Sequence, residues 1–191
     1  MALVVQEAAE MILSSGLISP WLMPCTMFFS APLPGAVSTE INLRVPALLP
    51  NTYCPDVHER LNLYKRLSNS DHADELTLLQ EELIDRFGAL PPQAESLIAT
   101  HQIRLQAVRW GMTKVDINQD QILVQFGPKT PADPMTLLWL IQNRRDMKLA
   151  GQDRIILSRH MPALSQRIQA FRELCALLEK SPADLAKLTK H

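Results

Sequence analysis

Polar and apolar residues alternate along residues 39–45, so Ile41, Leu43 and Val45 fall on one side of an extended segment. This two-residue period predicts a strand with one buried face. Three further short strands are expected, at residues 114–117, 121–126 and 154–157. The polar residues between the first two of these predict a tight turn, and hence a hairpin.

In five other stretches apolar residues recur every three or four positions, which is typical of amphipathic helices. The predicted helices are residues 55–69, 71–87, 92–110, 134–145 and 162–180. Proline opens four of them, because its fixed backbone suits the first helical turn. The other helix is expected to begin at a cap formed by Ser70 or Asp71 and to end at Gly88.

The same pattern predicts which side chains of the first two helices face the core. In the first helix they are Val57, Leu61, Tyr64 and Leu67, and in the second they are Leu76, Leu79, Leu83, Ile84 and Phe87. The helices come in a run, with hairpin strands between them and no repeated strand–helix–strand rhythm. The predicted fold class is therefore α+β, with several helices packed on short antiparallel strands.

Residues 1–35 differ from the rest of the chain. They contain only two charges, Glu7 and Glu10, and proline, serine and glycine interrupt their apolar runs too often for a membrane span or a signal peptide. We expect a poorly structured leader over 1–35, one domain over 36–180 and a polar tail over 181–191. The leader has the character of foreign or out-of-frame sequence, so a truncated or frameshifted fragment is expected.

Composition and motifs exclude several classes of function. The 191 residues carry 19 Lys+Arg against 20 Asp+Glu, and a net charge of −1 argues against a protein that coats nucleic acid. The cysteines Cys25, Cys54 and Cys175 lie too far apart for a disulfide framework or a zinc site, which favours the cytoplasm. The sequence has no phosphate-binding glycine loop, zinc-protease motif or serine-hydrolase motif, so no catalytic, cofactor-binding or metal-binding residue is predicted.

The most unusual local feature is acidic. Six carboxylates lie within fifteen residues, and they are Asp71, Asp74, Glu75, Glu81, Glu82 and Asp85. On a helix, Glu75, Leu78, Glu82 and Asp85 are expected to share one ridge. Acids near a helix C-terminus oppose the helix dipole, which favours a second use such as docking on a basic surface. A solvated face and a paired-carboxylate enzyme are the alternatives.

A second charged feature is basic. Residues 144–172 are rich in positive charge, with Arg144, Arg145, Lys148, Arg154, Arg159, Arg167 and Arg172. Such a surface would allow an independent nucleic-acid-binding module. No aromatic residues interleave with these cations as a stacking platform requires, so a solvated surface is the simpler interpretation.

Four segments carry a resemblance to a known family. They read INLRVPALLP at 41–50, YCPDV at 53–57, RLNLYKR at 60–66 and EELIDRFG at 81–88, the last followed by Leu90 and Pro91. Over about residues 38–180 the chain resembles the C-terminal domain of bacterial transcription-repair coupling factors, the Mfd family. Residues 1–35 do not resemble what precedes this domain in the family.

The resemblance implies a regulatory domain without catalysis of its own. In the family, a parent protein displaces stalled RNA polymerase by translocating on double-stranded DNA with ATP and magnesium bound elsewhere, and recruits UvrA. The C-terminal domain docks on the parent's UvrB-like N-terminal module and holds it autoinhibited. Acids of the EELIDRFG helix make this contact, which by position implies Glu82 and Asp85, with Glu75, Glu81 and Arg86 in the same protein interface.

Overall fold

The computed structural model describes residues 39–188, which form one compact unit. The leader expected over 1–35 lies outside the described residues. The elements in chain order are β1 (Glu40–Asn42), α2 (Val57–Asn69), α3 (Ala73–Phe87), α4 (Pro92–Arg109), β2 (Met112–Ile117), β3 (Gln121–Phe126), α5 (Pro134–Asn143), β4 (Met147–Leu149), β5 (Arg154–Ser158), α6 (Leu164–Leu178) and α7 (Pro182–Leu188). The predicted α+β class is confirmed.

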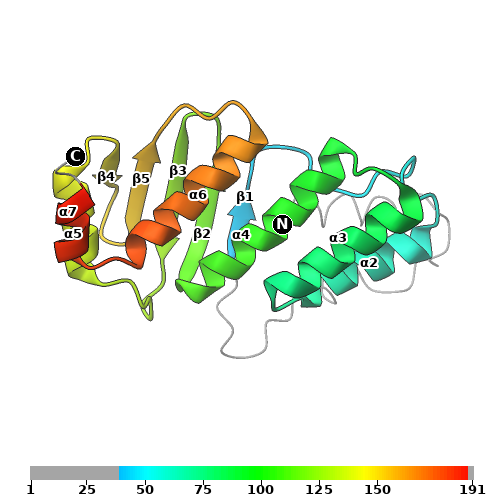
Figure 1. Ribbon diagram of the computed structural model, residues 1–191, viewed down its shortest axis with the longest axis horizontal. Helices are drawn as coiled ribbons and strands as arrows, with labels where there is room; N and C mark the ends of the chain where they lie inside the picture. Colours follow the sequence, from blue (N-terminus) through cyan, green and yellow to red (C-terminus); the bar gives the residue numbers. More distant parts are fainter. Residues whose placement is uncertain (1–38, 189–191) are drawn as a thin grey trace, which may run out of the picture. The chain divides into compact units, whose positions relative to one another are not determined.

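The strands form one sheet in the order β1-β2-β3-β5-β4 (Figure 1). The predicted hairpin joins β2 to β3, and the Asn118 side chain accepts hydrogen bonds from the backbone N–H groups of Asp120 and Gln121 in its turn. The sheet is mixed, because β1 runs parallel to β2 whereas the other pairs are antiparallel. Three helices separate β1 from β2, and a connection of that length allows parallel pairing.

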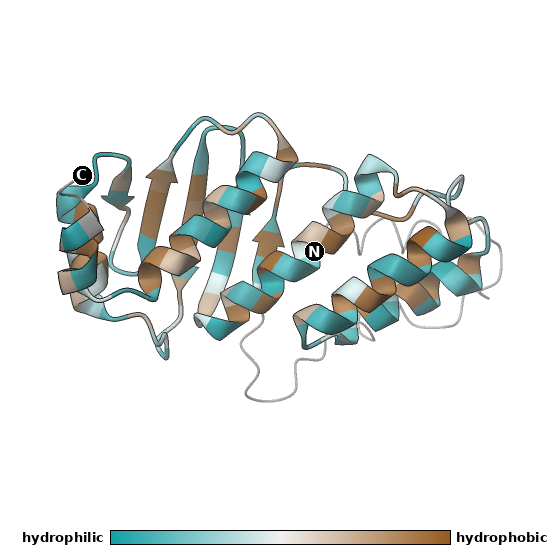
Figure 2. Ribbon diagram, viewed as in Figure 1, coloured by the Kyte–Doolittle hydropathy of each residue, from teal (hydrophilic) through white to brown (hydrophobic). Residues whose placement is uncertain are grey.

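Two apolar cores meet along α4. The first lies between the sheet and the helices α4 and α6, which cover the same face of it (Figure 1). Apolar residues run along β3 and β5, whereas each helix carries both apolar and polar residues (Figure 2). The second core joins α2 and α3 to the first half of α4 through residues such as Leu67, Leu83 and Leu97. Helix α4 therefore positions the α2–α3 pair relative to the sheet.

The structure corrects the predicted first strand and the start of the second helix. Strand β1 ends at Asn42, because Arg44 adopts a positive φ of 54° that breaks the extended backbone. Helix α3 is preceded by His72, which makes no side-chain cap. Ser70 instead ends α2, where its hydroxyl donates to the carbonyl oxygen of Arg66. Gly88 ends α3 with a φ of 85°, as predicted.

Some predicted core positions also differ. Leu63 is fully buried on α2, where the helix pattern predicted Leu61, and Ile84 on α3 is 44% exposed. The three-residue strand β4 was not predicted, since it is too short to show an alternating pattern. The predicted polar tail contains α7, whose Leu185 is buried. Within residues 39–188, no helix has the length and apolar character to cross a membrane.

Candidate functional site

Helix α3 presents one side to the second core and the opposite side to solvent. Its three buried leucines belong to that core. Asp74, Leu78, Glu81 and Asp85 follow one another at spacings of four, three and four residues, which aligns them on the outer side. All four side chains are exposed, and Leu78 reaches 66%. We call these four residues the outer stripe.

The outer stripe carries three carboxylates. Among the residues that the structure describes, Asp74, Glu81 and Asp85 make no ion pair. Asp74 lies in the first turn of α3, where negative charge suits the helix dipole. Glu81 and Asp85 lie in the last two turns, where negative charge opposes the helix dipole. The end of α3 therefore offers unneutralised negative charge to solvent.

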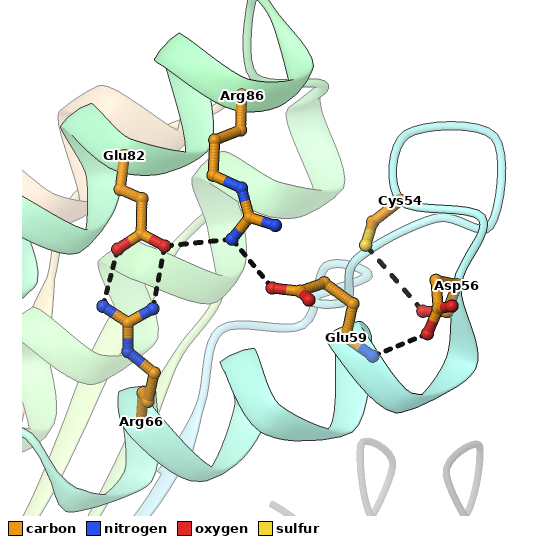
Figure 3. Close-up of polar contacts among 6 residues, drawn as sticks. All are labelled: Cys54, Asp56, Glu59, Arg66, Glu82 and Arg86. Atoms are coloured by element: carbon orange, nitrogen blue, oxygen red, sulfur yellow. Dashed lines mark hydrogen bonds and ion pairs between the residues drawn. The ribbon is translucent and has the colours of Figure 1, made fainter.

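Glu82 lies on the flank of α3 that faces α2, about 60° around the helix from Asp85. Its carboxylate accepts hydrogen bonds from both terminal nitrogens of Arg66, at 2.9 and 2.6 Å, and from Arg86 at 3.1 Å (Figure 3). Arg86 also donates to Glu59 on α2 at 2.8 Å. These contacts split the predicted ridge: Leu78 and Asp85 face solvent together, while Glu82 is held against α2.

The paired arginines keep Glu82 charged. Hydrogen bonds from Arg66, the main cause, and from Arg86 lower the pKa of Glu82 from 4.5 to about 2, while partial burial opposes the shift. The pKa of Arg66 is raised by the same pair. The sequence pattern did not reveal this network, because Arg66 stands sixteen residues before Glu82 on another helix.

Glu75 has a local role. Its carboxylate accepts a hydrogen bond of 2.9 Å from the backbone N–H of Asp71, four residues earlier. This contact satisfies a donor in the turn between α2 and α3, much as a capping side chain does. Glu75 thus stabilises the turn rather than lying beside Asp85 on one ridge.

Two of the sequence segments that carry the family resemblance meet at the end of α3. The Tyr53 hydroxyl lies 2.9 Å from the carbonyl oxygen of Leu83 and 3.0 Å from that of Gly88. Its ring packs against Phe87 with centroids 5.6 Å apart, and the Arg86 guanidinium lies 5.0 Å from the centre of the Phe87 ring. These contacts hold the last turn of α3, which carries Asp85, in one position.

A carboxylate enzyme would need Glu81 or Glu82 in a concave site. The cavity beside the α2–α3 pair has a volume of about 280 Å³ and is lined by Arg66, Asn69, Ser70, Glu75 and Leu79. Neither of the two glutamates lines it. Within residues 39–188, no three His, Cys, Asp or Glu side chains gather as a metal site requires.

The basic residues of 144–172 are not all free surface cations. Arg167 is 4% exposed and is turned inward. Arg144 pairs with Asp146 at 2.6 Å, and Arg159 pairs with Glu173 at 2.6 Å. Part of the positive charge expected there is therefore neutralised within the fold, whereas Arg145, Lys148 and Arg172 stay exposed without an ion pair among the described residues.

Comparison with known proteins supports the resemblance. The family model of the TRCF domain matches residues 43–137. The chain is 34% identical over 144 residues to the transcription-repair-coupling factor of Escherichia coli, covering 75% of this chain and 12% of that protein. It is 38% identical over 103 residues to the same factor of Haemophilus influenzae, covering 54% of this chain and 9% of that one. The chain thus spans about an eighth of the length of these relatives or less.

The fold agrees with the sequence comparison. The crystal structure of the C-terminal domain of a transcription-repair coupling factor superposes with a TM-score of 0.63 at 20% identity, covering 74% of this chain and 91% of that one. The resemblance inferred from the four segments is confirmed. The chain belongs to the TRCF domain family.

Proposed function

We propose that this chain is a regulatory interaction domain that acts in DNA repair by docking, through α3, on the UvrB-like N-terminal module of a transcription-repair coupling factor. In the docked state it covers the module's UvrA-binding surface and so acts as an autoinhibitory clamp. ATP hydrolysis, DNA translocation and the displacement of RNA polymerase belong to other parts of such a factor. The domain itself is non-catalytic and cytoplasmic under this proposal.

The observation that carries the proposal is the outer stripe. Asp74, Glu81 and Asp85 keep their charges unpaired among the described residues, although arginines are available on the neighbouring helix and on α3 itself. Leu78, 66% exposed, lies among these three acids. Unpaired carboxylates around an exposed apolar side chain suit a surface that binds a basic partner.

The strength of such a contact suits a releasable clamp. One exposed ion pair contributes only about 0.2–1 kcal/mol, whereas truncating one member of a desolvated interfacial pair costs about 2–5 kcal/mol. Three carboxylates and one leucine can therefore hold a closed state. Changing its population from 1:99 to 99:1 takes only about 5.5 kcal/mol, which engagement with another partner can supply.

The proposal is tested by titrating the full chain into the purified UvrB-like module of the same organism's coupling factor, at low and high salt. Asp85→Arg is expected to weaken binding by about tenfold or more, and salt to weaken it further. Asp120→Arg is the matched control, since the Asp120 side chain is 78% exposed in the β2–β3 turn, where it pairs with the exposed His160. Equal loss with both variants, or no loss with Asp85→Arg, would refute docking through α3.

A further inference from the structure

Glu82 is already occupied by the domain's own arginines. Arg66 donates to one carboxylate oxygen at 2.9 Å and to the other at 2.6 Å, and Arg86 adds a third hydrogen bond at 3.1 Å (Figure 3). A carboxylate accepts about four hydrogen bonds in total. A partner's guanidinium therefore cannot bind Glu82 through two parallel hydrogen bonds unless Arg66 leaves.

The two arginines are not equivalent. Arg86 keeps a second carboxylate, Glu59, at 2.8 Å, so the loss of Glu82 leaves it paired. Arg66 has no other ion-pair partner among the residues that the structure describes. Displacing Arg66 also leaves its positive charge beside an incoming cation, which is unfavourable. Arg66 is thus the member of the network that opposes capture of Glu82 from outside.

The network can open without unfolding. The side chains of Arg66 and Glu82 are 47% and 30% exposed, so both can reach water when the pair breaks. The second core beneath them is formed by apolar side chains and does not include either residue. Breaking the pair therefore exposes both side chains to water without removing a side chain from the second core.

We propose that Arg66 is an internal competitor for the docking partner: docking exchanges the Arg66–Glu82 ion pair for a pair between Glu82 and a basic side chain of the partner, and release restores the internal pair. This inference rests on the proposed docking through α3. It separates the roles of the acids, because Asp85 and Glu81 add new ion pairs on docking whereas Glu82 only exchanges one. The exchange limits the affinity of docking. When the domain leaves its partner, the Arg66–Glu82 pair forms again and neutralises both charges.

The test is a cycle of four full-length proteins, namely the natural sequence, Arg66→Gln, Glu82→Gln and the double variant, each titrated into the UvrB-like module. Removing the competitor in Arg66→Gln is expected to lower Kd by about two- to fivefold, the range that an exposed ion pair supplies. Glu82→Gln is expected to raise Kd more in the Arg66→Gln background than in the natural one.

Two controls exclude simpler causes. Arg109→Gln removes the same charge from an exposed pair with Glu179, on another part of the chain, and is expected to change Kd much less. Arg66→Lys keeps the charge but cannot form the two parallel hydrogen bonds, so its Kd is expected to lie between those of the natural sequence and Arg66→Gln. Urea unfolding of each variant reports whether the α2–α3 pair stays folded.

The outcomes separate the two proposals. Tighter binding by Arg66→Gln, with Glu82→Gln more damaging in that background, supports the exchange. Docking that depends on Asp85 but is unchanged by Arg66→Gln and Glu82→Gln keeps the proposed function and overturns the exchange, leaving Glu82 a purely structural link. Failure of every variant to bind overturns both.

Discussion

The guanidinium of Arg167 on α6 donates a hydrogen bond of 3.1 Å to the carbonyl oxygen of Leu43, 124 positions earlier in the chain. It also donates to the carbonyl oxygens of Met161 and Pro162, at 3.1 and 3.2 Å. These three acceptors belong to the segment after β1 and to the loop before α6. One buried arginine therefore ties the first described strand to the last long helix.

Replacing this arginine is expected to destabilise the domain. Arg167→Leu leaves buried carbonyl groups without a donor, and each such group costs about 1–3 kcal/mol. We expect a loss of about 3 kcal/mol in the free energy of unfolding, measured by urea denaturation. Arg172→Leu is the control, because Arg172 lies on the same helix but is exposed and donates to the Gln102 side chain at 3.1 Å, so its loss should stay within about 0.5 kcal/mol. Equal stability of the two variants would contradict the structural role of Arg167.

Arg167 also illustrates what the sequence can reveal. A run of arginines predicts a basic surface, but charge counting does not distinguish an arginine in solvent from one that bonds backbone carbonyls. Residue periodicity succeeded where an element is long: five predicted helices and the β2–β3 hairpin are present. It failed for β4, which has three residues and depends on pairing with β5.

The candidate site was predictable in its location but not in its internal arrangement. The acids of α3 stand out in the sequence, and Asp85 and Leu78 are exposed together as expected. The position of Glu82 depends on Arg66, which packs beside it only once α2 and α3 lie side by side. Pairing between helices of this kind has no periodic signature along one helix.

Charge reversal on the outer stripe should leave the fold intact. Asp85→Arg is expected to keep or slightly raise the stability of the domain, because a cation near the C-terminus of α3 suits the helix dipole. Leu83→Ala, at a fully buried position on the same helix, should lose about 2–5 kcal/mol. Thermal unfolding of both variants checks this. A loss for Asp85→Arg as large as that for Leu83→Ala would mean that Asp85 is structural.

The ion pairs of Glu82 predict a loss of stability in acid. The pKa of Glu82 is about 2 in the folded domain against an ordinary value of 4.5, so its stabilising contribution is complete above about pH 4.5. It is lost as the pH falls from 4.5 towards 2, where the folded carboxyl also takes up a proton. Glu82→Gln should flatten the pH dependence of unfolding in this window. An unchanged slope would show that the pair does not contribute to folding.

A buried histidine predicts a second acid-sensitive window. Burial, together with the positive charge of Arg104, lowers the pKa of His101 from 6.5 to about 4. The folded state therefore favours the neutral ring. The free energy of unfolding is not reduced by His101 above pH 6.5, and it declines as the pH falls from 6.5 towards 4, because the unfolded chain takes up the proton first. His101→Leu should remove this part of the slope in urea unfolding measured at several pH values. A slope that persists in His101→Leu between pH 6.5 and 4 would assign it to another group.

Gly111 joins α4 to β2 in a space that admits no side chain. Its φ is 62°, and a Cβ there would lie 2.9 Å from the Cα of Thr130, whereas Gly151 has a φ of 107° with open space around it. An alanine at either position adopts an unfavourable backbone conformation, which costs about 1–3 kcal/mol. Gly111→Ala should lose about 1–3 kcal/mol more than Gly151→Ala, because it also pushes backbone atoms apart. Urea denaturation of both variants measures the difference, and equal losses would mean that the segment containing Thr130 moves aside freely.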